Sequence, residues 1–183
     1  MSAWWIAELV LLAIGIAGAI IATVTGRTRW VLPAALPVAL GVALRAVGVA
    51  GPDHPAFVLG LGAAVLTLAT LGGNPVVALV LRLATRTARL GTHGGILITD
   101  VDSPAPDREI LRGGTTIGYL ERLALVGTIL VGQPAAIAVI VAVKGLGRFS
   151  ELENAAARER FIIGTLASLA WAAACTGILT VQW

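Results

Sequence analysis

Long apolar runs separated by short polar segments make up most of this chain. The two runs between Gly113 and Leu166 are too long and too continuous for the core of a water-soluble domain. The pattern predicts an all-α fold, a polytopic membrane helix bundle of about six transmembrane helices that forms one membrane domain. The predicted spans cover residues of about 4–25, 30–50, 56–84, 116–132, 134–148 and 161–181.

The basic residues predict how these spans are oriented. Arg27 and Arg29 directly follow the first run, and no basic segment precedes it, which is the reverse of a cleaved signal peptide. We therefore expect an uncleaved first helix with its N-terminus outside and, after six spans, an outside C-terminus. This topology places on the cytoplasmic side Arg27, Arg29, Arg82, Arg86, Arg89, Arg108, Arg112, Lys144, Arg148, Arg158 and Arg160. The expected location is the cell (inner) membrane, as a multi-pass protein.

Composition supports a membrane protein and excludes several other classes. Hydrophobic residues make up 57% of the chain and charged residues 13%, against about 25% charged residues in a soluble domain. The net charge of +3 is explained by basic loops, so nucleic acid is not an expected partner. Cys175 is the only cysteine, and His54 and His93 lie far apart in loops. We expect no disulfide, no metal site and no cofactor.

The third run is interrupted at Gly72-Gly73-Asn74-Pro75. Asn74 has the character of an N-cap and Pro75 that of a first helical residue, which predicts that a second helical segment starts there. We favour one broken or strongly kinked span, and the alternative is a span ending near Leu71 followed by an interfacial helix. A kink tolerated for packing is the simpler interpretation, but breaks of this kind can also expose backbone groups to a substrate or ion. Asn74 is therefore a candidate ligand residue.

One sizeable polar segment, the predicted cytoplasmic loop 85–114, follows the third span. Residues 96–101 have the pattern of a short strand, and residues 108–112 could pair with them as a hairpin. Asp100, Asp102 and Asp107 could in principle hold a divalent metal ion beside a phosphate, but a solvated loop explains them more simply.

Glu8 and Arg45 form the first candidate pair inside the predicted spans. The two residues lie at similar depths below the outer surface in adjacent antiparallel helices. A lone charge in a bilayer is costly, so pairing or access to water is expected. The pair would either lock two helices together or line a polar vestibule that admits an anion or a lipid headgroup.

A second charged cluster is expected in the inner leaflet. Glu121 lies about two turns into its helix, and Lys144 lies about one turn from the end of the next, antiparallel helix. We predict a Glu121–Lys144 pair, with Arg122 and Arg148 directed toward lipid headgroups. This cluster would either be structural or form a basic inner pocket for phosphate or an anionic lipid.

The second half of the chain also resembles an uncharacterised family of bacterial integral-membrane proteins of unknown function. The resemblance covers residues of about 113–170 and rests on the segments Ile117-Gly118-Tyr119-Leu120-Glu121-Arg122, Ala142-Val143-Lys144, Arg148-Phe149, Glu151-Leu152 and Arg160-Phe161-Ile162-Ile163-Gly164-Thr165-Leu166-Ala167-Ser168. It departs from the family at Gly145, where a hydroxyl residue is expected after the lysine. The resemblance implies a helical membrane bundle with an inner cluster of Glu, Arg and Lys.

The sequence leads to one favoured function and two alternatives. It contains no Ser-His-Asp set and no phosphate-binding glycine loop, so an enzyme is the less favoured class but stays an alternative. The favoured function is a transporter- or channel-like protein that handles a small anion or an anionic amphiphile or lipid. The alternatives are a scaffold or accessory subunit of a larger complex, and a lipid-modifying enzyme that uses Asp100 and Asp102. Expected partners are membrane lipids and either a second copy of the chain or another membrane protein.

Overall fold

The computed structural model describes residues 4–50, 54–84, 89–90, 96–98, 108–110, 114–147 and 155–180. Most of these residues are helical. The helices are α1 (Trp4–Thr25), the 3-10 turn η1 (Thr28–Trp30), α2 (Val31–Ala46), α3 (Pro55–Ala84), α4 (Gly114–Leu130), α5 (Ala136–Gly147) and α6 (Ala155–Thr180). Three short strands lie between α3 and α4, namely β1 (Arg89–Leu90), β2 (Ile96–Ile98) and β3 (Arg108–Ile110).

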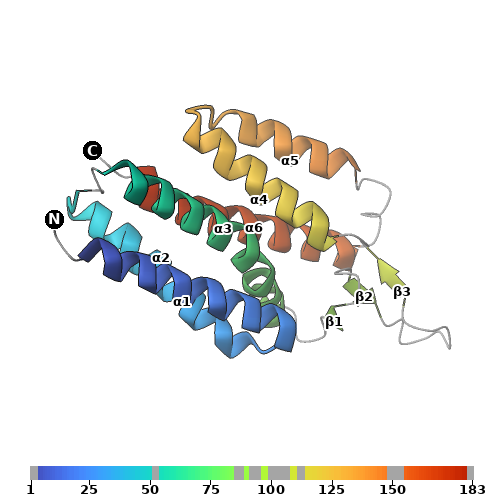
Figure 1. Ribbon diagram of the computed structural model, residues 1–183. Coiled ribbons are helices and arrows are strands. Elements are labelled where there is room, and N and C mark those ends of the chain that lie inside the picture. The colour runs from blue at the N-terminus through green and yellow to red at the C-terminus, as the bar shows by residue number, and fades with distance from the viewer. Residues whose placement is uncertain are drawn as a thin grey trace.

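The six α-helices lie side by side and alternate in direction along the chain (Figure 1). We call the end at which α1 begins and α6 ends the terminal end. The opposite end, beyond which the three strands lie, is the sheet end (Figure 1). As a result α4 and α6 both start at the sheet end, and α5 returns to it.

Helix α3 is the centre of the bundle, because it packs against α6, α1 and α4. The interior between these helices is apolar, with Leu12, Val65, Leu68 and Leu125 almost completely buried. A glycine allows one especially close contact. A Cβ atom at Gly72 of α3 would lie 2.6 Å from the indole ring of Trp171 in α6, so only glycine fits there without displacement.

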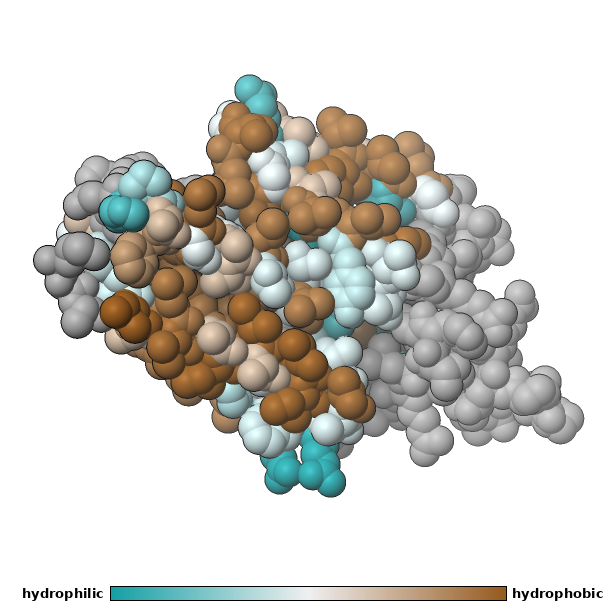
Figure 2. All heavy atoms as spheres, in the orientation of Figure 1, coloured by the Kyte–Doolittle hydropathy of each residue, from teal (hydrophilic) through white to brown (hydrophobic). Residues whose placement is uncertain are grey.

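Four segments of the described chain are long and apolar enough to cross a membrane: residues 5–25, 28–46, 55–84 and 157–179. Many large apolar side chains on the outside of the bundle are exposed, and hydrophobic residues cover much of the described surface on the face shown in Figure 2, with smaller hydrophilic patches among them. An exposed apolar surface of this extent is typical of contact with lipid or a partner. The other two predicted spans correspond to α4 and α5, which have only 17 and 12 residues.

The structure decides between the interpretations of the third span: it is one kinked helix, as we favoured, and not a span followed by an interfacial helix. Helix α3 continues without interruption through residues 72–75, and Pro75 lies inside it. Asn74 is therefore not the N-cap of a new segment, and no separate interfacial helix starts after Leu71. Proline lacks an N–H, so the carbonyl of Leu71 receives no helical hydrogen bond from position 75, and the part of α3 after this position bends away from the first part (Figure 1).

The predicted hairpin in the polar loop is confirmed. Strands β2 and β3 pair in antiparallel fashion, with Leu97 opposite Glu109. Strand β1 pairs with the other edge of β2 and was not expected from the sequence. The order β1-β2-β3 forms a small sheet, which is the only departure from the predicted all-α class within the described residues.

Candidate functional site

The described charged residues are distributed unequally between the two ends of the bundle. At the sheet end, Arg27, Arg29, Arg82 and Arg158 are exposed. Among the contacts that the structure describes, two buried charged networks lie within the bundle, one near each end, and they differ in how completely their polar atoms are paired.

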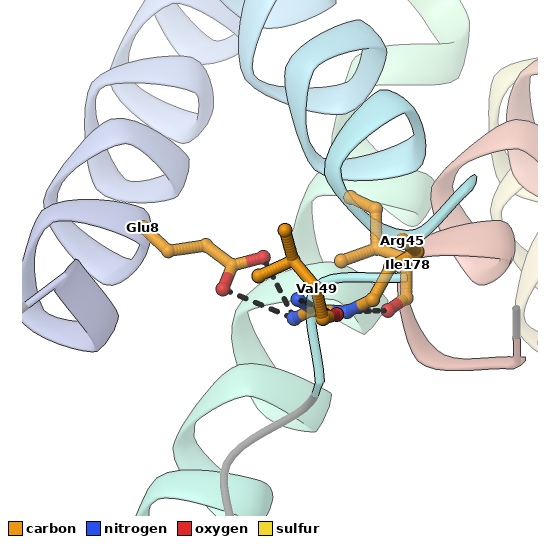
Figure 3. A network of polar contacts seen from close by, with 4 residues as sticks. All are labelled: Glu8, Arg45, Val49 and Ile178. Carbon is orange, nitrogen blue, oxygen red and sulfur yellow. Dashed lines mark hydrogen bonds and ion pairs between the residues drawn. The ribbon is translucent and has the colours of Figure 1, made fainter. Parts of the chain in front are cut away.

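The network at the terminal end joins Glu8 of α1 to Arg45 of α2 (Figure 3). Nη2 of Arg45 lies 3.0 Å from each carboxylate oxygen of Glu8. Nε of Arg45 donates to the carbonyl of Ile178 in α6 at 3.1 Å, and Nη1 donates to the carbonyl of Val49 at 3.4 Å. The ring of Trp5 lies 5.6 Å from the guanidinium carbon. The predicted Glu8–Arg45 pair is confirmed.

This terminal network has the character of a structural lock. It connects three helices, both carboxylate oxygens of Glu8 accept hydrogen bonds, and both residues are buried. Buried ion pairs are tolerated when further hydrogen bonds satisfy their remaining atoms. Here those bonds are present, so the geometry favours a helix lock over an open vestibule.

The network nearer the sheet end is centred on Arg122 of α4, which is only 1% exposed. Its Nε donates to the carbonyl of Thr70 at 2.9 Å, Nη1 to the hydroxyl of Ser168 at 3.0 Å and Nη2 to Oδ1 of Asn74 at 2.8 Å. Arg122 thereby joins α4 to both α3 and α6. The prediction that Arg122 is directed toward lipid headgroups is wrong.

Two glycines explain why Arg122 turns inward. Thr70, Gly73 and Asn74 lie on one face of α3, at positions i, i+3 and i+4. A Cβ atom at Gly73 would lie 2.4 Å from Nε of Arg122, and one at Gly118 would lie 3.1 Å from Nη1. Without these side chains, the guanidinium can fold back along α4, as helical side chains tend to do, and reach the backbone of α3.

The three acceptors of Arg122 are all neutral. No ion pair joins Arg122 to a carboxylate within the part of the chain that the structure describes. A guanidinium has five N–H groups, and three of them are used in these bonds. The ring of Tyr119, 5.4 Å from the guanidinium carbon, is the remaining contact that favours a cation. Arg122 therefore makes no ion pair with a carboxylate among the described residues.

Glu121, the preceding residue, faces a different helix because successive helical residues differ by about 100° in direction. Its Oε2 accepts a hydrogen bond from Nζ of Lys144 in α5. The amine of Lys144 also lies 5.6 Å from the ring of Phe161 in α6. The predicted Glu121–Lys144 pair is confirmed, and it is the polar link between α5 and the rest of the bundle in the described residues.

Several buried polar atoms of this region have no hydrogen-bond partner in the described part of the chain. They include Oε1 of Glu121, Nδ2 of Asn74 and Oγ1 of Thr165. Thr165 precedes Ser168 by three residues, so both lie on the same face of α6. Buried polar atoms without a partner are uncommon and indicate either internal water or a ligand. We refer to Asn74, Glu121, Arg122, Lys144, Thr165 and Ser168 as the inner polar cluster.

The sequence did not indicate Thr165, Ser168 or Gly73 as members of this site. The sequence does contain one signal for Thr165 and Ser168, since they are two hydroxyl residues three positions apart in an otherwise apolar run. Arg148, Asp100, Asp102 and Asp107 lie outside the described residues. Among the residues that are described, no group of three His, Cys, Asp or Glu side chains could hold a metal ion.

Comparison with known proteins gave no match: no protein-family model, no curated protein and no solved structure is similar to this chain. The resemblance of residues 113–170 to an uncharacterised bacterial membrane family therefore stays a prediction.

Proposed function

We propose that this chain is a small multi-pass protein of the cell (inner) membrane that binds and moves a small anion or an anionic amphiphile. The observation that supports this proposal is the charge of the inner polar cluster. Arg122 and Lys144 carry two positive charges against the single carboxylate of Glu121. The three residues together leave one positive charge, and all three side chains are largely removed from solvent.

An excess positive charge of this kind favours a negatively charged ligand. Placing an unpaired charge in a bilayer costs at least about 2.5 kcal/mol on insertion scales, and a bound anion would offset this cost. Guanidinium and ammonium groups recognise phosphate and carboxylate through charge-assisted hydrogen bonds. Nδ2 of Asn74 and the hydroxyl of Thr165 add donors that have no partner in the described chain.

The proposed topology has six spans, with both termini outside and the sheet end in the cytoplasm. The exposed arginines at the sheet end support this orientation, since basic residues concentrate on the cytoplasmic side. Helices α4 and α5 would be about 26 and 18 Å long at 1.5 Å per residue. Both are shorter than a hydrocarbon core of about 30 Å, so the membrane beside them would have to thin.

An accessory subunit of a membrane complex is the second candidate function. It is favoured by helix α5, in which no residue is fully buried by the rest of the chain. Its exposed valines, Val139, Val141 and Val143, would then contact a partner protein or a second copy. Copurification of a stoichiometric partner, lost when these valines are replaced by serine, would support this function over transport.

Anion transport is tested by reconstituting the purified protein in phosphatidylcholine vesicles and measuring uptake of radiolabelled phosphate. Lys144→Gln should lower the initial rate by about tenfold or more, which corresponds to about 1.4 kcal/mol of lost binding. Arg158→Gln removes an exposed cation at the same end and serves as the matched control. Equal rates for wild type and Lys144→Gln, with both proteins folded, would rule out this site as the anion path.

A further inference from the structure

We infer that Glu121 is an internal competitor for the ligand, which we assign as a phosphate group, either free or in a lipid headgroup. In the ligand-free protein the carboxylate of Glu121 is paired with the amine of Lys144. An incoming phosphate displaces this carboxylate and binds the amine in its place. This inference rests on the proposed function, because it concerns the same cluster and names its ligand class.

The pairing of Glu121 is incomplete, unlike that of the other buried glutamate. Both oxygens of Glu8 accept hydrogen bonds from Arg45. Only Oε2 of Glu121 is bonded, and its buried Oε1 has no partner in the described residues. A buried carboxylate oxygen without a donor is destabilising. Glu121 is therefore held less firmly than a carboxylate whose only role is to lock two helices.

Lys144 is the member of the cluster best placed to exchange partners. Its side chain is 17% exposed, compared with 10% for that of Glu121, and it lies near the end of α5 at the sheet end. No residue of α5 is fully buried, so this lysine can move without displacing a fully buried side chain of its own helix. The ammonium group has three N–H donors, one of which is bonded to Glu121.

The other members of the cluster fit a phosphate group better than a simple halide ion. A phosphate presents several acceptor oxygens, and the unpaired groups on α3 and α6, Nδ2 of Asn74 and Oγ1 of Thr165, are separate donors. A phosphate also carries up to two negative charges, and so gains more than a carboxylate from Lys144 and Arg122 together. Because Glu121 and phosphate are both negative, they compete for Lys144 instead of sharing it.

The test is the affinity of the purified, full-length protein for inorganic phosphate in phosphatidylcholine nanodiscs, measured by calorimetric titration. Glu121→Gln removes the competing charge and should bind phosphate about tenfold more tightly than wild type. Glu159→Gln makes the same charge change on an exposed residue at the same end of the bundle, and it should bind like wild type. The double variant Glu121→Gln, Lys144→Gln should lose the gain in affinity.

The source of the phosphate is separated by a second arm with phosphatidylglycerol in the nanodiscs. Native mass spectrometry would count the phosphatidylglycerol molecules that stay bound after release from the nanodisc. Tighter binding of free phosphate by Glu121→Gln indicates a soluble ligand, and retention of additional phosphatidylglycerol by this variant indicates a lipid headgroup. Either result supports the role of Glu121 as a competitor.

Binding by Glu121→Gln that is equal to or weaker than binding by wild type, for both probes, would overturn the inference. The proposed function would still stand if wild type binds either probe through Lys144, and it fails if wild type binds neither. Glu121→Asp keeps the charge but withdraws it from Lys144 by one methylene group, and provides a second variant if Glu121→Gln does not fold. It should show a smaller gain in affinity, and the absence of any gain would again refute the competitor role.

Discussion

Replacing Gly73 by alanine tests directly whether Arg122 is clamped against the backbone of α3. The added Cβ atom would lie 2.4 Å from Nε and 2.5 Å from Cδ and Cζ of Arg122. These atoms lie in the middle of a side chain whose far end is held by Ser168 and Asn74. The arginine cannot move away without breaking at least one of its hydrogen bonds, and a lost hydrogen bond to a charged group costs about 1.5–3 kcal/mol.

The expected net loss in the free energy of unfolding for Gly73→Ala is about 1.5 kcal/mol, because alanine in a helix returns roughly 0.5–1 kcal/mol relative to glycine. For a chain of this size such a loss lowers the melting temperature by about 3–6 °C, measurable by thermal unfolding in detergent. Gly62→Ala in the same helix is the matched control, since a Cβ atom there meets nothing within 4 Å. If Gly73→Ala melted at or above the temperature of Gly62→Ala, the buried position of Arg122 would be refuted.

Two further predictions concern the terminal lock and the topology. Glu8→Gln removes the carboxylate that pairs with the buried Arg45 and should lower the free energy of unfolding by about 3 kcal/mol. The double variant Glu8→Gln, Arg45→Met should recover most of this loss. Equal stability of the single variant and wild type would show that the pair is not structural. In a Cys175→Ala background, the variant His54→Cys at an exposed position should react with a membrane-impermeant maleimide from outside intact cells. The variant Arg82→Cys, also at an exposed position, should react only after the cells are permeabilised. The reverse labelling pattern would show that the topology is inverted.

The sequence was sufficient for the features that depend on position along the axis of the bundle. Glu8 and Arg45 lie at matched depths in consecutive antiparallel helices, and so do Glu121 and Lys144. Both pairs form in the structure. Depth follows from counting residues at a fixed rise per residue, so it can be predicted before the packing is known. The hairpin of residues 96–98 and 108–110 was predicted from local pattern in the same way.

Features that depend on the rotation of a helix about its axis could not be predicted in this way. Arg122 was assigned to the headgroup region from its depth alone, yet its side chain enters the bundle. Its direction depends on two glycines, Gly73 and Gly118, and on acceptors contributed by two other helices. Of these residues, only Gly118, one turn before Arg122 in the same helix, is close to Arg122 in the sequence. The pattern at residues 72–75 predicts a broken or strongly kinked span, and α3 does bend without a break, but the pattern does not show that Gly72 and Gly73 provide space for Trp171 and Arg122.

Each of the two buried networks contains a glutamate paired with a basic residue, and only one of them is the candidate ligand site. The presence of charge within an apolar run is therefore not sufficient to locate a functional site in this chain. The two networks differ in how completely they are satisfied. At the terminal end both oxygens of Glu8 are paired and Arg45 is bonded to α6. In the inner polar cluster one oxygen of Glu121 has no partner among the described residues, and the cations outnumber the carboxylate. In a medium of low dielectric constant a completely paired network adds rigidity, and an incompletely paired one is costly unless something else binds to it. For this reason we expect the ligand to bind at Glu121 and Lys144, and we expect the Glu8–Arg45 pair to stabilise the fold.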